Sequence, residues 1–135
     1  MMHIHIPFEK LAYQFQDKPL LIGGKAMEYY GLRKAGADID MVISLNDHAN
    51  LKKQYPDHIQ DLDGDIGICE FEFELWNQIC RYEYEELKAG AIEEAEVLVI
   101  SLEKLLFLKT LAIKEEKYYQ DVLLLVDEIL KRKYS

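Results

Sequence analysis

Two short stretches of the chain alternate strictly between apolar and acidic residues. In "DIDMVIS" the apolar residues fall on one face of an extended strand, and Asp38 and Asp40 fall on the other. The stretch "CEFEFEL" repeats this pattern, with its acids at Glu70, Glu72 and Glu74. A period of two is typical of a β-strand that has one face in a core. Both stretches therefore predict strands of a sheet.

Helices are predicted between strands in the first half of the chain. Residues 19–24, "PLLIGG", form a short apolar run ended by glycines, which is typical of a buried strand. Residues 25–34 then predict a helix that stops near Gly36. A second short helix is predicted from an N-cap at Asn46 to about Lys53.

The middle of the chain predicts a β-hairpin. Its turn is expected near Asp63 and Gly64, because both residue types favour turns. The chain is expected to return as one long strand from about Ile66 to Trp76. The three glutamates of "CEFEFEL" would then lie on one face of that strand.

The last third of the chain predicts a helical hairpin. After a short strand in "EVLVI", Ser101 predicts the N-cap of a helix that runs to about Lys117. A second helix, from about Tyr119 to Lys131, ends in basic residues that suit the negative end of its dipole. Its apolar stripe is expected to consist of Val122, Leu125, Val126, Ile129 and Leu130.

These elements predict a single domain over residues 1–135 with an α/β (α+β) fold. A mixed β-sheet flanked by helices is expected over about 19–100, and the helical part over about 101–135. No linker-like segment separates the two parts, so one shared core is expected.

Composition and charge restrict the possible functions. No apolar run approaches the roughly 20 residues of a membrane span, so no membrane partner is expected. The N-terminus lacks a signal-peptide pattern, and Cys69 and Cys80 lack metal-ligand spacing, which favours a cytoplasmic protein. The net charge of −9 argues against tight, unaided binding to DNA or RNA. A metal-bridged polyphosphate remains compatible with this charge.

The acidic strand faces have two interpretations. Acids on an exposed strand keep sheet edges from aggregating, and this alone could explain "EFEFE". Alternatively, Asp38 and Asp40, roughly 6.5 to 7 Å apart along a strand, could hold Mg²⁺ or Mn²⁺ together with the second acidic strand. Like charges on neighbouring strands destabilise a sheet, and a bound cation would compensate them.

Two glycines favour the metal interpretation. Gly23 and Gly24 end an apolar strand and precede a helix, an arrangement that lets backbone N–H groups approach a phosphate. A phosphate-binding turn followed by a pair of aspartates indicates a metal-dependent site for a polyphosphate.

These motifs resemble the nucleotidyltransferase superfamily, specifically the minimal nucleotidyltransferases and the abortive-infection-type nucleotidyltransferase toxins. The family pattern is an apolar strand ending in Gly-Gly or Gly-Ser, a helix, an Asp-x-Asp pair and a third acid on a later strand. This chain has "LIGG" and then "DIDMV". Its segment "VLVISLEKLLFLKTLAIKEEKYYQDVLLL" is similar to the family's serine-led helix with a lysine and its Lys-x-x-x-Asp helix start. The resemblance covers roughly residues 19–130.

The resemblance implies which residues would bind the nucleotide. Gly23 and Gly24 would hold the triphosphate, and Lys25 directly follows them. Lys109 and Lys117 could contact phosphate as point charges.

The resemblance also implies a set of catalytic acids. Asp38 and Asp40 would bind the metal, and one glutamate of "EFEFE" would complete the site. Glu72 is the expected third acid because of its central position, and Glu74 is the second choice as a metal ligand.

The expected reaction transfers a nucleoside monophosphate from a nucleoside triphosphate to a hydroxyl of RNA, protein or a small molecule. Two alternatives remain open. The chain could be a catalytically inactive binding module of the same fold, such as a toxin–antitoxin component with a protein partner. It could also be a structural protein whose acidic strands are solvated edges.

Overall fold

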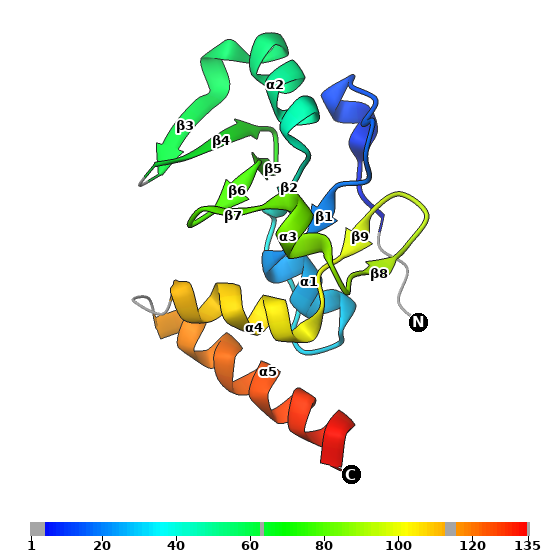
Figure 1. Cartoon of the computed structure of the whole chain (residues 1–135), viewed down its shortest axis with the longest axis vertical. Helices are drawn as coiled ribbons and strands as arrows, with labels where there is room; N and C mark the ends of the chain where they lie inside the picture. The colour runs from blue at the N-terminus through cyan, green and yellow to red at the C-terminus, as the bar shows by residue number, and fades with distance from the viewer. Residues whose placement is uncertain (1–4, 63, 113–115, 135) are drawn as a thin grey trace.

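A computed structural model gives the fold (Figure 1) and describes residues 5–62, 64–112 and 116–134. Within these residues, a seven-stranded mixed β-sheet flanked by helices forms the centre of the molecule, which confirms the expected fold class. The strands of this sheet are β1 (Leu20–Leu21), β2 (Ile39–Val42), β3 (Ile59–Leu62), β4 (Asp65–Glu70), β5 (Phe73–Trp76), β8 (Ile92–Glu93) and β9 (Leu98–Val99).

The strand order of the sheet is β3-β4-β5-β2-β1-β9-β8. Strand β2 lies near the middle, parallel to β5 and antiparallel to β1. Strand β1 is parallel to β9, and the remaining pairs of this sheet are antiparallel. The two acidic segments are therefore brought together, because β2 and β5 are direct neighbours.

The helices lie on both sides of this sheet. In Figure 1, α2 lies on one side, and α1, α4 and α5 lie on the other. A small separate hairpin and two 3₁₀ turns, η1 and η2, complete the fold. The bounds are η1 (Phe8–Leu11), α1 (Gly23–Tyr29), α2 (Leu45–Gln54), η2 (Pro56–His58), β6 (Gln78–Ile79), β7 (Tyr82–Glu83), α3 (Tyr84–Lys88), α4 (Leu102–Leu111) and α5 (Glu116–Tyr134).

The core is built from both faces of the central strands. Leu20 and Leu21 are consecutive in β1 and are both fully buried, because helices cover the sheet on both sides. The apolar residues of β2 pack beside those of β5, as the alternating pattern predicts. Fully buried members of this core include Met41, Phe73 and Leu75.

Two helix caps follow from local sequence. Ser101 caps α4 by accepting a hydrogen bond from the backbone N–H of Lys104, as predicted. Helix α2 is capped by Ser44 and not by Asn46, because Ser44 has the extended backbone of an N-cap and accepts from the N–H of Asp47. Asn46 is the second residue of that helix.

Helix α1 begins and ends earlier than the sequence pattern suggests. Its first residue is Gly23, so the two glycines lie inside the helix and not before it. It ends at Tyr29, because Gly31 adopts the left-handed conformation, with φ +73°, that terminates helices. Residues 32–37 therefore form a loop in place of the expected last turn.

The prediction of one long strand from Ile66 to Trp76 is wrong. The chain turns at Phe71 and Glu72, which separate β4 from β5 and make them an antiparallel hairpin. Phe71 has φ +54°, the left-handed conformation of a tight hairpin turn. The first hairpin, of β3 and β4, lies where it was predicted.

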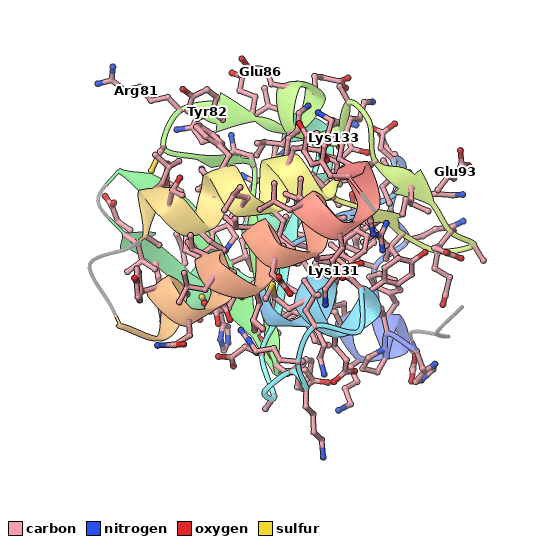
Figure 2. All side chains as sticks on the ribbon, turned by 90° about the horizontal axis from the view of Figure 1, so that it is seen from below. Arg81, Tyr82, Glu86, Glu93, Lys131 and Lys133 are labelled. Carbon is pink, nitrogen blue, oxygen red and sulfur yellow. The ribbon has the colours of Figure 1, made fainter. Side chains whose placement is uncertain are left out.

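The C-terminal helices pack against each other, as expected for a helical hairpin. Figure 2 shows α4 and α5 side by side, with Lys131 and Lys133 projecting from the end of α5. The expected apolar stripe of α5 is only partly buried: Leu125 lies in the core, whereas Val126 and Leu130 are exposed. No helix in the described ranges has the length and apolar character needed to cross a membrane.

Candidate functional site

The central feature of the candidate site is the pairing of Asp40 with Glu74. The two residues are partners in the register of the parallel strands β2 and β5. Register partners point to the same face of a sheet, and neighbouring strands are about 4.8 Å apart. Cys69 of β4 is the partner of Glu74 on the other side, so it lies on this face as well. The opposite face of β2 and β5 carries the buried residues Ile39, Met41, Phe73 and Leu75.

Gly23 lies directly against Asp40. A Cβ placed on Gly23 would stand 2.7 Å from Oδ2 of Asp40 and 3.2 Å from its Cβ. Gly23 also has φ +64°, so a residue with a side chain would be both strained and in collision there. The first glycine of "LIGG" therefore serves a close approach of the backbone to the carboxylate.

Asp38 completes the acidic group from the residue just before β2. Its side chain is exposed, and it lies outside the strand. Burial raises the pKa of the Cys69 thiol, and the charges of Glu74, Asp40 and Asp38 raise it further. The negative charges of these three carboxylates, here called the acidic group, thus act on the same thiol.

The other two glutamates of "EFEFE" lie elsewhere. Glu70 is the register partner of Phe73, on the face opposite to Glu74, and pairs with His58 at 3.1 Å. Glu72 lies in the turn, where Lys10 donates to its carboxylate at 3.1 Å. The expectation that all three glutamates share one face is therefore wrong. Glu74 is the one in register with Asp40.

The pKa of the Glu72 carboxyl lies below its ordinary value. The hydrogen bond from Lys10 is the largest cause, and the charges of Lys10 and Lys25 contribute. Lys25 of α1 therefore acts on the turn that carries Glu72. It follows Gly24 directly, at the start of the helix.

The predicted phosphate contacts at Lys109 and Lys117 have different outcomes. Lys109 is buried, and its Nζ donates to Asp121 at 2.8 Å while lying 4.8 Å from the centre of the Tyr118 ring. A side chain in this position supports its neighbours and does not face solvent. The side chain of Lys117 lies outside the described part of the structure.

A cluster of charges that the sequence pattern did not indicate joins the loop after α1 to the C-terminal helices. Arg33 binds both oxygens of Asp121, with Nε to Oδ1 at 2.6 Å and Nη2 to Oδ2 at 2.8 Å. Burial disfavours the charge of Asp121, but the hydrogen bonds from Arg33 and Lys109 outweigh it and hold its pKa below the ordinary value. Helix α5 is thus tied to the loop that leads into β2.

The acidic group fits a hard divalent cation by its chemistry. Mg²⁺ is usually bound through one or two carboxylates, with water and substrate phosphates completing its octahedron. Asp40 and Glu74 supply two adjacent carboxylates, and Asp38 lies in the same group. Among the described residues, no three His, Cys, Asp or Glu side chains are arranged as a complete metal site.

Comparison with other proteins gives no relative from which a function could be transferred. No protein-family model, curated protein or solved structure matches the chain. The resemblance to nucleotidyltransferases stays a prediction.

Proposed function

We propose that the chain is a nucleotidyltransferase that depends on a divalent metal and transfers a nucleoside monophosphate to a hydroxyl acceptor. One observation carries this proposal: Asp40 and Glu74 are register partners on neighbouring strands, and Asp40 lies against Gly23. Two carboxylates beside a glycine turn form the arrangement from which a metal–triphosphate site can be built.

The acidic residues have distinct roles in this proposal. Asp40 and Glu74 would hold Mg²⁺ or Mn²⁺, and Asp38 would contribute from its exposed position before β2. The ion, when bound, supplies charge neutralisation for the triphosphate and for the departing pyrophosphate. Glu74 also replaces Glu72 as the proposed third acid, since Glu72 lies in the turn and is paired with Lys10.

The remaining residues position the reactants. The backbone N–H groups at Gly23 and Gly24, at the start of α1, would approach the phosphates. The absence of a side chain at Gly23 leaves room for the carboxylate of Asp40 beside it. A carboxylate of the acidic group would accept the proton of the acceptor hydroxyl as the new phosphoester bond forms. Phosphoryl transfer requires mainly such positioning and charge compensation.

The proposal names the acceptor of the nucleoside monophosphate by its chemical class, a hydroxyl group. A hydroxyl of RNA, protein or a small molecule fits the reaction. The net charge of −9 disfavours a nucleic acid that binds without help, and a basic protein partner could supply the missing attraction.

The test is transfer of label from α-labelled nucleoside triphosphates in the presence of Mg²⁺ or Mn²⁺. Wild-type protein should transfer label to an acceptor in a cell extract, and chelation of the metal should abolish it. The double variant Asp38→Ala, Asp40→Ala should be inactive while remaining folded. Transfer that survives this double substitution would overturn the proposed mechanism.

Calorimetry separates the proposal from its alternatives. Metal-dependent binding of ATP without transfer to any acceptor would indicate an inactive binding module of the same fold. Absence of metal-dependent ATP binding in wild-type protein would indicate that the acidic face is only solvated.

A further inference from the structure

Arg33 lies over Gly24, the second residue of α1. Its two terminal nitrogens, Nη1 and Nη2, lie 3.5 and 3.7 Å from the place where a Cβ on Gly24 would stand. The first glycine contacts Asp40 in the same way. The two glycines therefore have an acid on one side and a guanidinium on the other.

The guanidinium of Arg33 is held in place from its far side. Asp121 of α5 accepts from Nε and Nη2, and the carbonyl of Lys34 accepts from Nη1 at 3.1 Å. A guanidinium has five N–H groups. Three of them donate to these described residues, so one N–H on each terminal nitrogen remains available to an acceptor.

The loop that carries Arg33 is also fixed. The carboxylate of Glu28 in α1 accepts from the backbone N–H of Ala35 at 2.8 Å. The N–H of Leu32 donates to the carbonyl of Met27 at 3.0 Å. Because both ends of the loop segment are tied to α1, Arg33 has a defined position relative to Gly24.

Lys109 sets the net charge of this cluster. Asp121 carries one negative charge, and it is paired with two cations, Arg33 and Lys109. If Asp121 had only Arg33 as a partner, the two side chains would have no net charge to attract a ligand. With buried Lys109 also present, the three side chains together keep one positive charge. In a chain of net charge −9, this excess next to a glycine turn favours an anion.

We propose that Arg33 binds the terminal phosphates of the nucleoside triphosphate, with Asp121 orienting its guanidinium and Lys109 compensating the charge of Asp121. This inference rests on the proposed function, because it names the phosphate ligand of the same site. The acids at Asp38, Asp40 and Glu74 take the metal side of the triphosphate, and Arg33 takes the opposite side. Lys109 is a positioning residue here and does not touch the substrate.

The division of roles gives Lys109 a task other than a direct phosphate contact. A guanidinium offers two parallel donors to a phosphate, whereas an ammonium acts as a point charge. Arg33 lies at the glycines, while Lys109 is enclosed between Asp121 and the ring of Tyr118. Of these two cationic side chains, the one that lies at Gly24 thus also has the better geometry for phosphate.

The main experiment compares three proteins by calorimetry with Mg²⁺-ATP and with inorganic tripolyphosphate. The test variant is Arg33→Gln, and the matched control is Arg81→Gln, which removes the same charge from the exposed β6–β7 turn at the edge of the molecule (Figure 2). Arg33→Gln should weaken both ligands by about tenfold or more, because a charge-assisted hydrogen-bond pair is lost. Arg81→Gln should bind as wild type does. Equal binding by all three proteins would overturn the proposal.

Arg33→Lys tests whether the two parallel N–H donors of the guanidinium are needed for binding. It keeps the charge, so it should recover only part of the lost affinity, and it should raise KM for the nucleoside triphosphate more than it lowers kcat. Full recovery by lysine would contradict a bidentate phosphate contact.

A measurement on wild-type protein covers the case in which Arg33→Gln does not fold. The side-chain Nε–H signal of Arg33 is identified by elimination, using Arg81→Gln and Arg132→Gln to assign the other arginines. Addition of tripolyphosphate should shift the Arg33 signal and leave the other two unchanged. An Arg33 signal that does not move at saturating ligand would overturn the proposal.

The outcomes also separate this inference from the proposed function. Nucleotide transfer by wild type with an unchanged KM in Arg33→Gln would refute the role of Arg33 and leave the transferase proposal intact. Binding of tripolyphosphate through Arg33 without any nucleotide transfer would refute the transferase proposal and leave the anion site intact.

Discussion

Asp40 of β2 stands directly beside Glu74 of β5, and the apolar residues on either side of this pair determine that position. Ile39 pairs with Phe73, and Met41 pairs with Leu75, on the buried face of the same two strands. A shift of one residue would move these apolar side chains out of the core. The core therefore fixes the register, and the register brings two like charges together, which is unfavourable without compensation.

The first prediction concerns the identity of the third acid. Glu74→Gln should weaken Mn²⁺ binding by about tenfold or more, because a carboxylate beside Asp40 is lost. Glu72→Gln should leave it nearly unchanged, since Glu72 lies in the turn and pairs with Lys10. Electron paramagnetic resonance of free Mn²⁺ during titration gives the affinity of each variant in the presence of ATP.

The two glutamine variants serve as controls for each other. They remove the same charge and lie two residues apart in the chain. If Glu72→Gln caused the larger loss, the metal site would lie at the turn and not at the pair of strands.

The second prediction concerns Gly23. Gly23→Ala should destabilise the fold by about 1 to 2 kcal/mol, the usual penalty for a left-handed alanine, and its new Cβ should displace the carboxylate of Asp40. Gly31→Ala has the same backbone penalty at φ +73°, but no atom lies within 4 Å of its Cβ. Thermal unfolding and Mn²⁺ titration of both variants distinguish strain from displacement.

The expected result is a loss of stability in both variants, larger in Gly23→Ala because of the collision with Asp40, and a loss of metal affinity only in Gly23→Ala. Equal metal affinity in the two would show that the contact between Gly23 and Asp40 has no part in the site.

The hairpin at Phe71 and Glu72 shows how a correct strand pattern can give a wrong face. In a two-residue hairpin, residues i and i+3 become partners, as Glu70 and Phe73 do. Register partners lie on the same face of the sheet, so Phe73 shares a face with Glu70 and Glu74 lies on the other face. The alternation of acidic and apolar residues in the sequence continues through the turn and does not show this change of face. The turn itself has no glycine, asparagine or proline, so the sequence "CEFEFEL" contains no local signal for it.

Most strands and turns with a strong local pattern were predictable, whereas the turn at Phe71 and the cluster around Asp121 were not. The strand at Asp40, the turn at Gly64 and the cap at Ser101 each follow from a few adjacent residues. The pairing of β2 with β5 was expected from the acidic pattern that both strands share, whereas the contact of Arg33 with Asp121 joins segments that no pattern connects. Asp40 was thus selected from sequence, and its register partner Glu74 was named only as the second choice, after Glu72.

The third prediction concerns the contact between Gly67 and Trp76. A Cβ on Gly67 would stand 2.6 Å from the ring of Trp76, so Gly67→Ala should force the ring to move and cost about 1 to 3 kcal/mol as an overpacked core does. Trp76 is the single tryptophan of the chain, so its fluorescence reports the displacement. Gly36→Ala, where no atom lies within 4 Å and φ is not positive, is the control and should change neither quantity. An unaltered emission spectrum in Gly67→Ala would contradict the close contact.

The fourth prediction concerns the buried carboxylate of Asp121. Asp121→Asn should destabilise the fold at pH 7 by about 3 to 5 kcal/mol, because Arg33 and buried Lys109 lose their shared counter-ion. Asp127→Asn removes a carboxylate from an exposed pair with Lys131 on the same helix, and it should cost at most about 1 kcal/mol. Urea unfolding of the three proteins gives these differences.

The pH dependence of the stability of the same variants tests whether the charge of Asp121 causes the destabilisation. The pKa of Asp121 is lower in the folded protein than its ordinary value of about 3.9, so the unfolded chain binds the proton more readily and stability rises with pH. The stabilisation by Asp121 should be fully present above about pH 4 and should be lost as the pH falls through the folded-state value. The difference in free energy of unfolding between wild type and Asp121→Asn should therefore decrease in acid. The corresponding difference for Asp127→Asn should stay small at every pH. A difference for Asp121→Asn that is constant from pH 7 to below about pH 3 would mean that the amide disturbs packing and that the charge of Asp121 is not what holds Arg33 and Lys109 together.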